Sequence, residues 1–272
     1  MDWRDMDPAA LDAAYSNARA VPAAPDIIAG WAAASARLRE ARPAGLDRPY
    51  GPSERERWDL FPAADPAAPC LVFIHGGYWQ RNSREGFACM AEGALAAGWA
   101  AALPGYTLAP DAGLSRIVEE LRRALDWLAA SGRALGIGGP VLLSGWSAGG
   151  HLAALLSGHP SVRAALAISG IFDLEPIRGT TLNDKLALTA DEIAGLSPQR
   201  LPPTGTPLAV AYGGRELPEL RRQSREFHAL RAEAGAPGPL LTVPDADHFS
   251  ILEELRGRDG KLLKAAASLL ES

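Results

Sequence analysis

Cysteine is scarce in this sequence, with only Cys70 and Cys89 among 272 residues. Two cysteines cannot build a disulfide framework, and the lack of a CxxC pair or a Cys/His cluster excludes the common structural zinc sites. Both residues stand in apolar stretches, which predicts two buried thiols that stay reduced.

Clustered charge and long hydrophobic runs are also missing. The formal net charge is −5 with a pI near 5.6, and no block of like charges occurs, which argues against nucleic acid or an anionic membrane as partner. No apolar stretch is long and clean enough to cross a bilayer. The residues Met1 to Pro8 are acidic and lack an apolar region, so no signal peptide is predicted. These absences together predict a cytoplasmic protein.

The chain is ordinary in composition, with 47% hydrophobic and 22% charged residues. This length predicts one domain over residues 1–272, which is enough chain for a single large core. A helical pattern over 26–41 lies within a predicted N-terminal helical segment of about 1–45. The Pro- and Gly-rich stretch 42–55 predicts a loop.

Short apolar runs alternate with helical patterns along the rest of the chain. The apolar runs are continuous rather than alternating, which is typical of strands covered on both faces. This order predicts an α/β protein with a mostly parallel central sheet and helices on both faces. The predicted strands are 58–61, 70–74, 99–103, 141–144, 164–168, 207–212 and 240–243, and the later helices are 84–97, 114–131, one from 148, 217–234 and 258–271.

One stretch breaks this alternation. Residues 171–206 contain several Pro and Gly residues and have weak periodicity. We expect a lid or insertion there, with one or two short helices.

The strongest local motif is the G-x-S-x-G pentapeptide Gly145–Gly149. It follows a predicted strand and opens an apolar helix, which is the context of a nucleophile elbow. Such a turn needs small flanking residues and exposes the serine at a helix N-terminus, where backbone N–H groups stabilise developing negative charge. The motif predicts Ser147 as a nucleophile.

A second motif, His75-Gly76-Gly77, directly follows the predicted strand 70–74. Glycines at the end of a strand allow the backbone to approach a substrate and to aim N–H groups at an oxyanion. We expect the backbone N–H groups of Gly77 and Ala148 to form an oxyanion hole, with Gly76 or Tyr78 as a third donor.

A general base is expected near the end of the chain, because the order in this motif class is serine, acid, histidine. His248 fits, since it follows the strand 240–243 in a polar loop. Asp245 and Asp247 are too close in sequence to orient its ring, so we expect them to shape its loop.

Two carboxylates remain candidates for the acid. Glu216 is the first carboxylate after the strand 207–212, and glutamate can replace aspartate in orienting an imidazole. Asp173, which follows the strand 164–168, is the alternative.

Three aromatic residues flank these motifs, namely Tyr78, Trp79 and Trp146. They could line a pocket for an aryl or compact apolar group. The alternative for them is packing beneath the loops.

At this point the sequence resembles the kynurenine formamidase (arylformamidase) branch of the hormone-sensitive-lipase-like α/β-hydrolases. The resemblance spans most of the chain, and the motifs that carry it are His75–Trp79, Tyr106–Pro110, Gly145–Gly150, Ser169–Leu174 and Asp247–Phe249, with Tyr15-Ser16 and Pro49–Gly51. It implies the α/β-hydrolase fold, Ser147, Glu216 and His248 as a triad, and hydrolysis of aryl formamides or activated short esters without a cofactor. The family commonly has aspartate where this chain has Glu216.

These inferences together predict a serine hydrolase that cleaves small esters or aryl formamides through an acyl-enzyme. The alternatives are a general carboxylesterase or an amidase for xenobiotics and, from another class, a hydrolase scaffold that binds a ligand without catalysis. We expect a small-molecule substrate, no metal, no cofactor, no nucleic acid and no membrane. A homodimer is compatible with the sequence, which leaves the oligomeric state and the natural substrate open.

Overall fold

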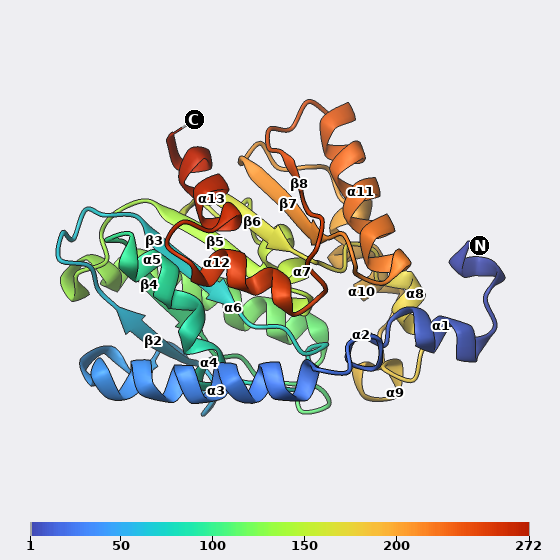
Figure 1. Ribbon diagram of the computed structural model, residues 1–272, viewed down its shortest axis with the longest axis horizontal. Coiled ribbons are helices and arrows are strands. Elements are labelled where there is room, and N and C mark those ends of the chain that lie inside the picture. Colours follow the sequence, from blue (N-terminus) through green and yellow to red (C-terminus); the bar gives the residue numbers. More distant parts are fainter. Residues whose placement is uncertain (1, 272) are drawn as a thin grey trace.

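Eight strands form one sheet in the computed structural model, which describes residues 2–271 (Figure 1). The spatial order of the strands is β1-β2-β4-β3-β5-β6-β7-β8. Their bounds are β1 Arg48–Pro49, β2 Arg57–Phe61, β3 Cys70–Ile74, β4 Ala100–Pro104, β5 Val141–Trp146, β6 Val162–Ile168, β7 Leu208–Gly213 and β8 Leu240–Val243.

The six strands from β3 to β8 run parallel, whereas β1 and β2 are antiparallel to their neighbours. The centre of the sheet is β3, in which Val72 pairs with Ala102 of β4 and with Leu143 of β5. Parallel strands place their carboxyl ends at one edge of the sheet, where ligands bind in open α/β folds. The loops after β3, β5, β7 and β8 therefore meet at this edge, which we call the strand-end rim.

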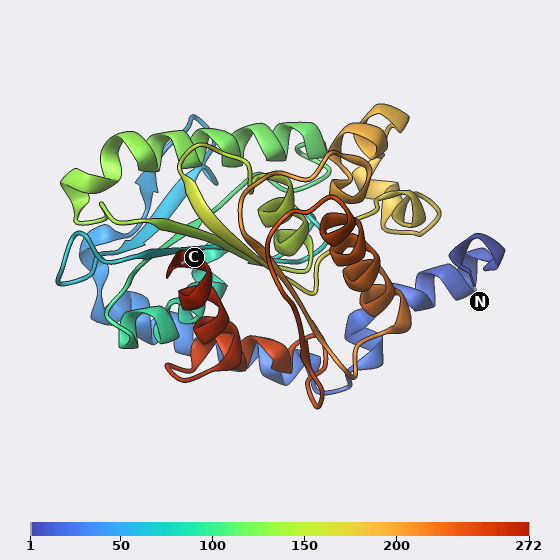
Figure 2. The same cartoon turned by 90° about the horizontal axis from the view of Figure 1, so that it is seen from above.

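Helices cover both faces of the sheet, as the view from above shows (Figure 2). Along β3, Val72 belongs to one apolar cluster, while Leu71 and Phe73 belong to a second cluster on the opposite face. The first cluster includes residues of α6 (Leu114–Ser131), α7 (Ala148–Leu155) and α11 (Pro218–Glu233). The second includes residues of α3 (Ala24–Ala41), α4 (Arg84–Phe87), α5 (Glu92–Ala96), α12 (Glu253–Arg256) and α13 (Lys261–Glu271).

The predicted fold class is confirmed, and the seven predicted strands differ from the observed ones by at most two residues at either end. Continuous apolar strands were a reliable guide because both faces of the sheet are buried. Cys70 and Cys89 are buried and free, as expected.

Three local expectations differ from the structure. The predicted helix 84–97 is interrupted by the 3₁₀ helix Ala88–Ala91, and the predicted loop 42–55 contains β1. The N-terminal segment of about 1–45 is helical, as expected, and contains α1 (Pro8–Ala14) and α2 (Asn17–Ala20) in addition to α3. Residues 171–206 contain three short α-helices instead of one or two, namely α8 (Glu175–Arg178), α9 (Asn183–Leu186) and α10 (Ala190–Leu196). Short elements of this kind depend on tertiary contacts, because too few residues propagate each of them.

Candidate active site

Ser147 occupies a strained turn between β5 and α7. Its φ of 58° and ψ of −118° place a non-glycine residue at positive φ, which costs about 1–3 kcal/mol and is typical of functional sites. A Cβ at Gly145 would lie 2.1 Å from the carbonyl oxygen of Gly149, and one at Gly149 would lie 2.0 Å from that of Ile74. Both glycines are therefore required for this turn, which explains the spacing of the motif.

The glycine loop after β3 lies against this turn. A Cβ at Gly76 would approach the carbonyl oxygen of Trp146 to 2.6 Å, and Gly77 has a φ of 120°. The backbone N–H groups of Gly77 and Ala148 donate to no other group among residues 2–271. Ala148 is the first residue of α7, where N–H groups have no intrahelical acceptor. Two unpaired N–H groups from different turns are the donors that an oxyanion hole requires.

His75 forms a hydrogen bond that orders the glycine loop after β3. Its Nδ1 lies 2.8 Å from the carbonyl oxygen of Gly76, and its ring stacks on Tyr106 with ring centres 4.5 Å apart. Burial lowers the pKa of His75 to about 4, so the ring is neutral near pH 7 and donates from Nδ1. Asn82 donates to the same carbonyl from Nδ2 at 3.1 Å. The contribution of Asn82 was missed because its role depends on a loop conformation with φ of 75°.

His248 and Glu216 are brought together from the ends of β8 and β7. The Nδ1 atom of His248 lies 3.1 Å from Oε2 of Glu216, and both side chains are buried. The other carboxylate oxygen of Glu216 accepts from Ser169 Oγ at 2.6 Å and from the backbone N–H of Gly213 at 2.5 Å. The carboxylate is therefore fixed on both oxygens, and Ser169 is a residue that the sequence analysis did not assign to the site.

The loop around His248 is ordered by two further contacts. Trp146 donates from Nε1 to the carbonyl oxygen of His248 at 2.7 Å, and the two rings lie 4.9 Å apart. Asp247 accepts from the backbone N–H groups of Phe249 and Ser250, each at 2.9 Å. Asp247 thus shapes the loop, as expected, and leaves the imidazole to Glu216.

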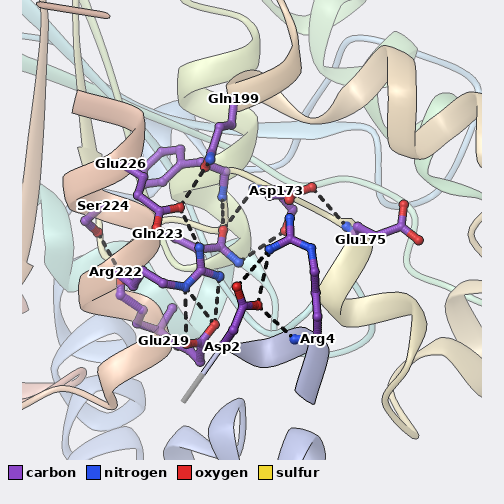
Figure 3. A network of polar contacts seen from close by, with 12 residues as sticks. Asp2, Arg4, Asp173, Glu175, Gln199, Glu219, Arg222, Gln223, Ser224 and Glu226 are labelled. Carbon is purple, nitrogen blue, oxygen red and sulfur yellow. Dashed lines mark hydrogen bonds and ion pairs between the residues drawn. The ribbon is translucent and has the colours of Figure 1, made fainter. Parts of the chain in front are cut away.

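Asp173, the alternative acid, is engaged elsewhere (Figure 3). Its carboxylate accepts from Nε of Arg200 at 2.9 Å and from the backbone N–H of Glu175 at 3.2 Å. Its own backbone N–H donates to Gln223 Oε1 at 2.9 Å. The carboxylate next to His248 is therefore Glu216, and Asp173 belongs to a polar network between α8 and α11.

Ser147 and His248 line the same cavity, which has a volume of about 470 Å³. No hydrogen bond joins the two side chains, although both belong to the residues that the structure describes. Hydrogen bonds between such groups are often long before substrate binds and tighten in the complex. The hydroxyl group of Ser147, the imidazole of His248 and the glycine loop with Gly77 therefore line one cavity.

The aromatic residues divide between cavity and core. Tyr78 and Trp146 line the cavity, together with Phe249 and Ile28. Trp79 is fully buried and packs edge-on against His151 with ring centres 5.1 Å apart, and it does not line the cavity. The pocket assignment of Trp79 is therefore wrong. Tyr78 and Trp79 both have positive φ, yet the side chain of Tyr78 lines the cavity and that of Trp79 is buried in the core.

The largest contribution that the sequence analysis missed is the N-terminal segment. Five consecutive residues, Tyr15–Arg19, line the cavity together with Asp12, and we call these six residues the N-terminal wall. Tyr78 donates its hydroxyl proton to the carbonyl oxygen of Tyr15, and Asp12 accepts from the backbone N–H of Thr181 at 2.8 Å. Only the resemblance at Tyr15-Ser16 pointed to this segment.

Charge at the cavity is mixed. Arg19 and Arg81 line it and form no ion pair within residues 2–271, whereas Asp12 accepts two hydrogen bonds from Thr181. In the described part of the chain, no three His, Cys, Asp or Glu side chains are grouped to hold a metal ion. No helix among residues 2–271 has the length and apolar character needed to cross a membrane.

A mostly parallel sheet with a serine turn after β5 and a histidine loop after β8 defines an α/β-hydrolase. A protein from Silicibacter sp. TM1040, whose crystal structure is described as that of a candidate thioesterase, is 31% identical and superimposes with a TM-score of 0.83. This match covers 94% of this chain and 98% of that protein. A family model named BD-FAE matches residues 60–182.

The kynurenine formamidases of Danio rerio and Salmo salar are each 30% identical to this chain. The matches cover 99% and 98% of the chain, respectively, and 98% of each relative. The chain belongs to the kynurenine formamidase family.

Proposed function

We propose that this chain is a serine hydrolase that cleaves aryl formamides and small carboxylic esters through a covalent acyl-enzyme. The observation that carries the proposal is the arrangement of His248. Its Nδ1 faces the fixed carboxylate of Glu216, while its ring shares a cavity with Ser147. This is the relation of base, orienting group and nucleophile that activates a hydroxyl group.

In the first half of the reaction, Ser147 Oγ bonds to the carbonyl carbon and His248 Nε2 takes the hydroxyl proton. The negative charge that develops on the carbonyl oxygen is stabilised by the N–H groups of Gly77 and Ala148, with Gly76 nearby. One such donor is typically worth about 2.7–4 kcal/mol in the transition state. The carbon–nitrogen or carbon–oxygen bond then breaks, and His248 returns the proton to the leaving amine or alcohol.

In the second half, water attacks the acyl- or formyl-enzyme. His248 takes a proton from the water molecule, and the ester bond to Ser147 breaks with return of that proton to Oγ. Glu216 keeps the Nδ1 proton in place, so that Nε2 is the free acceptor at the start of each half-reaction. Ser147, His248 and Glu216 therefore have the same protonation states before the first half-reaction and after the second.

The formamide substrate class rests on the family. It is supported by relatives of nearly the same length that are named kynurenine formamidases. The aromatic side chains of Tyr78, Trp146 and Phe249 in the cavity are compatible with an aryl group. We propose a free small molecule as substrate.

The role of Ser147 is tested with Ser147→Ala. We expect hydrolysis of phenyl acetate and of N-formylkynurenine to fall by at least about 10⁴-fold, while the protein stays folded. A fluorophosphonate probe should label the wild type on Ser147. Ser144 is the matched control, because it is buried in β5 and does not line the cavity. Ser144→Ala should keep activity within about threefold, whereas full activity in Ser147→Ala would refute the proposal.

The substrate class is tested by comparing kcat/KM on one preparation for N-formylkynurenine, 4-nitrophenyl acetate and 4-nitrophenyl butyrate. We expect the formamide to be cleaved at least as efficiently as the acetate, although the ester is intrinsically more reactive. Cleavage of the esters alone would favour the general carboxylesterase.

A further inference from the structure

Asn17, one of the residues that line the cavity, has one side-chain polar atom without a hydrogen-bond partner. The residue is only 4% exposed, and its Oδ1 is buried and accepts no hydrogen bond. Asn17 lines the same cavity as Ser147 and His248. Buried polar atoms of side chains are nearly always paired, so this acceptor calls for an explanation.

The neighbouring hydrogen bonds fix which way the Asn17 amide points. Tyr78 has one hydroxyl proton and donates it to the carbonyl oxygen of Tyr15. Burial raises the pKa of Tyr78 above its ordinary value, so the hydroxyl keeps this proton near pH 7. The same hydroxyl must therefore accept from Asn17 Nδ2, which lies 3.1 Å away. A flipped amide would place two acceptors face to face, so Oδ1 is the atom left free.

We infer that Asn17 Oδ1 accepts a hydrogen bond from an N–H group of the substrate, and thereby favours amides and anilides over esters of the same shape. The inference rests on the proposed function. It identifies the N–H of the leaving group as the feature that the site recognises. An unpaired buried acceptor is unfavourable in the free protein, and a substrate N–H relieves that cost on binding. The oxygen of an ester has no hydrogen to donate, so an ester leaves Asn17 unpaired.

The test compares formanilide with phenyl formate, which differ only in the N–H or oxygen at the bond that is cleaved. Formate release is measured for the wild type and Asn17→Leu, with rates corrected for spontaneous hydrolysis. In Asn17→Leu we expect kcat/KM for formanilide to fall about 5- to 10-fold, the range for one hydrogen bond, with phenyl formate within about twofold.

Asn183 provides a matched control. Its Oδ1 accepts from the backbone N–H of Leu188 at 2.9 Å, and it does not line the cavity. Asn183→Leu should leave the ratio of anilide to ester activity unchanged. In Asn17→Leu the free energy of unfolding should hardly fall, because the substitution removes an unpaired atom along with one hydrogen bond.

Three results would overturn the inference. Equal losses on both substrates in Asn17→Leu would show that Asn17 only positions Tyr78 and the glycine loop. No change on either substrate would show that Oδ1 is not used. A wild type that cleaves phenyl formate but not formanilide would also refute it, while Ser147-dependent ester cleavage would leave the serine hydrolase mechanism standing.

Discussion

The strand-end rim and the N-terminal wall line the same cavity but are held in place by different means. The rim is fixed by backbone geometry, with Ser147 at positive φ and glycines at positions where a Cβ would collide with carbonyl oxygens. The wall is fixed by a few side-chain contacts over long sequence separations, such as Tyr78 with Tyr15 and Asp12 with Thr181. We therefore expect the chemistry to depend on the rim and the choice of substrate to depend on the wall.

After Ser147→Ala, the largest effect on the rim is expected from Glu216→Gln. Oε1 of Glu216 accepts from Ser169 and from the backbone of Gly213, so the amide oxygen of a glutamine would take this place. Its NH₂ group would then donate to His248 Nδ1 and force the proton onto Nε2, which could no longer accept from Ser147. We expect kcat to fall about 10³- to 10⁴-fold with KM little changed. Ser169→Ala, measured in parallel, should lose only about tenfold, and an active Glu216→Gln would contradict the role of the carboxylate.

The next effect contrasts two glycines. At Gly149 a Cβ would lie 2.0 Å from a backbone oxygen, whereas at Gly30 in α3 nothing lies within 4 Å. Gly149→Ala should lower the free energy of unfolding by about 1–3 kcal/mol. It should also lower kcat about 10²-fold, because the turn that holds Ser147 shifts. Gly30→Ala should raise the free energy of unfolding by about 0.5–1 kcal/mol and leave activity unchanged, because alanine has a higher helix propensity than glycine at an exposed position inside a helix. Urea titrations and ester assays on the same samples measure both, and a neutral Gly149→Ala would show that the turn can relax.

A third effect is the pH dependence of stability. Burial lowers the pKa of His75 and of His151 to about 4, against about 6.5 in an unfolded chain. The unfolded state therefore binds more protons below pH 6.5, and stability is lost as pH falls from about 6.5 towards 4. Each histidine should contribute a loss of about 2 kcal/mol between pH 7 and pH 5. His151→Gln should make the decline in urea midpoint shallower, and an unchanged decline would contradict the assignment to His151.

The smallest effect is expected on the wall. Asp12 accepts from the backbone N–H and the hydroxyl of Thr181 at 2.8 and 3.0 Å, in an exposed setting. Asp12→Ala should raise KM about two- to fivefold with kcat within twofold, and should cost less than about 1 kcal/mol in stability. Asp259→Ala, far more exposed on the loop before α13, is the control and should change neither constant. A large loss of kcat in Asp12→Ala would mean that wall and rim are not separable.

The contrast between the strand-end rim and the N-terminal wall also explains which parts of the site could be predicted from the sequence. Apolar runs located the strands, and the glycine spacing around Ser147 and Gly77 located the turns, because local sterics dictate both. His248 followed from its place after the last strand. Ser169, Asn82 and the N-terminal wall were missed because their roles depend on contacts between distant segments. Trp79 was misplaced because the direction of its ring depends on the conformation of the loop after β3, where Tyr78 and Trp79 both have positive φ, and the local sequence pattern does not indicate that conformation.

Trp146 connects the turn that carries Ser147 with the loop that carries His248, and this connection bears on inactivation by heat. It precedes Ser147 in the chain, and its indole N–H holds the carbonyl oxygen of His248, a residue 102 positions away. The segments that carry the Ser147 hydroxyl and the His248 imidazole are thereby held together by a hydrogen bond and do not move as two independent loops. We therefore expect activity and tertiary structure to be lost at the same temperature on heating. The two losses should share a single midpoint, and activity should not fall before the protein unfolds.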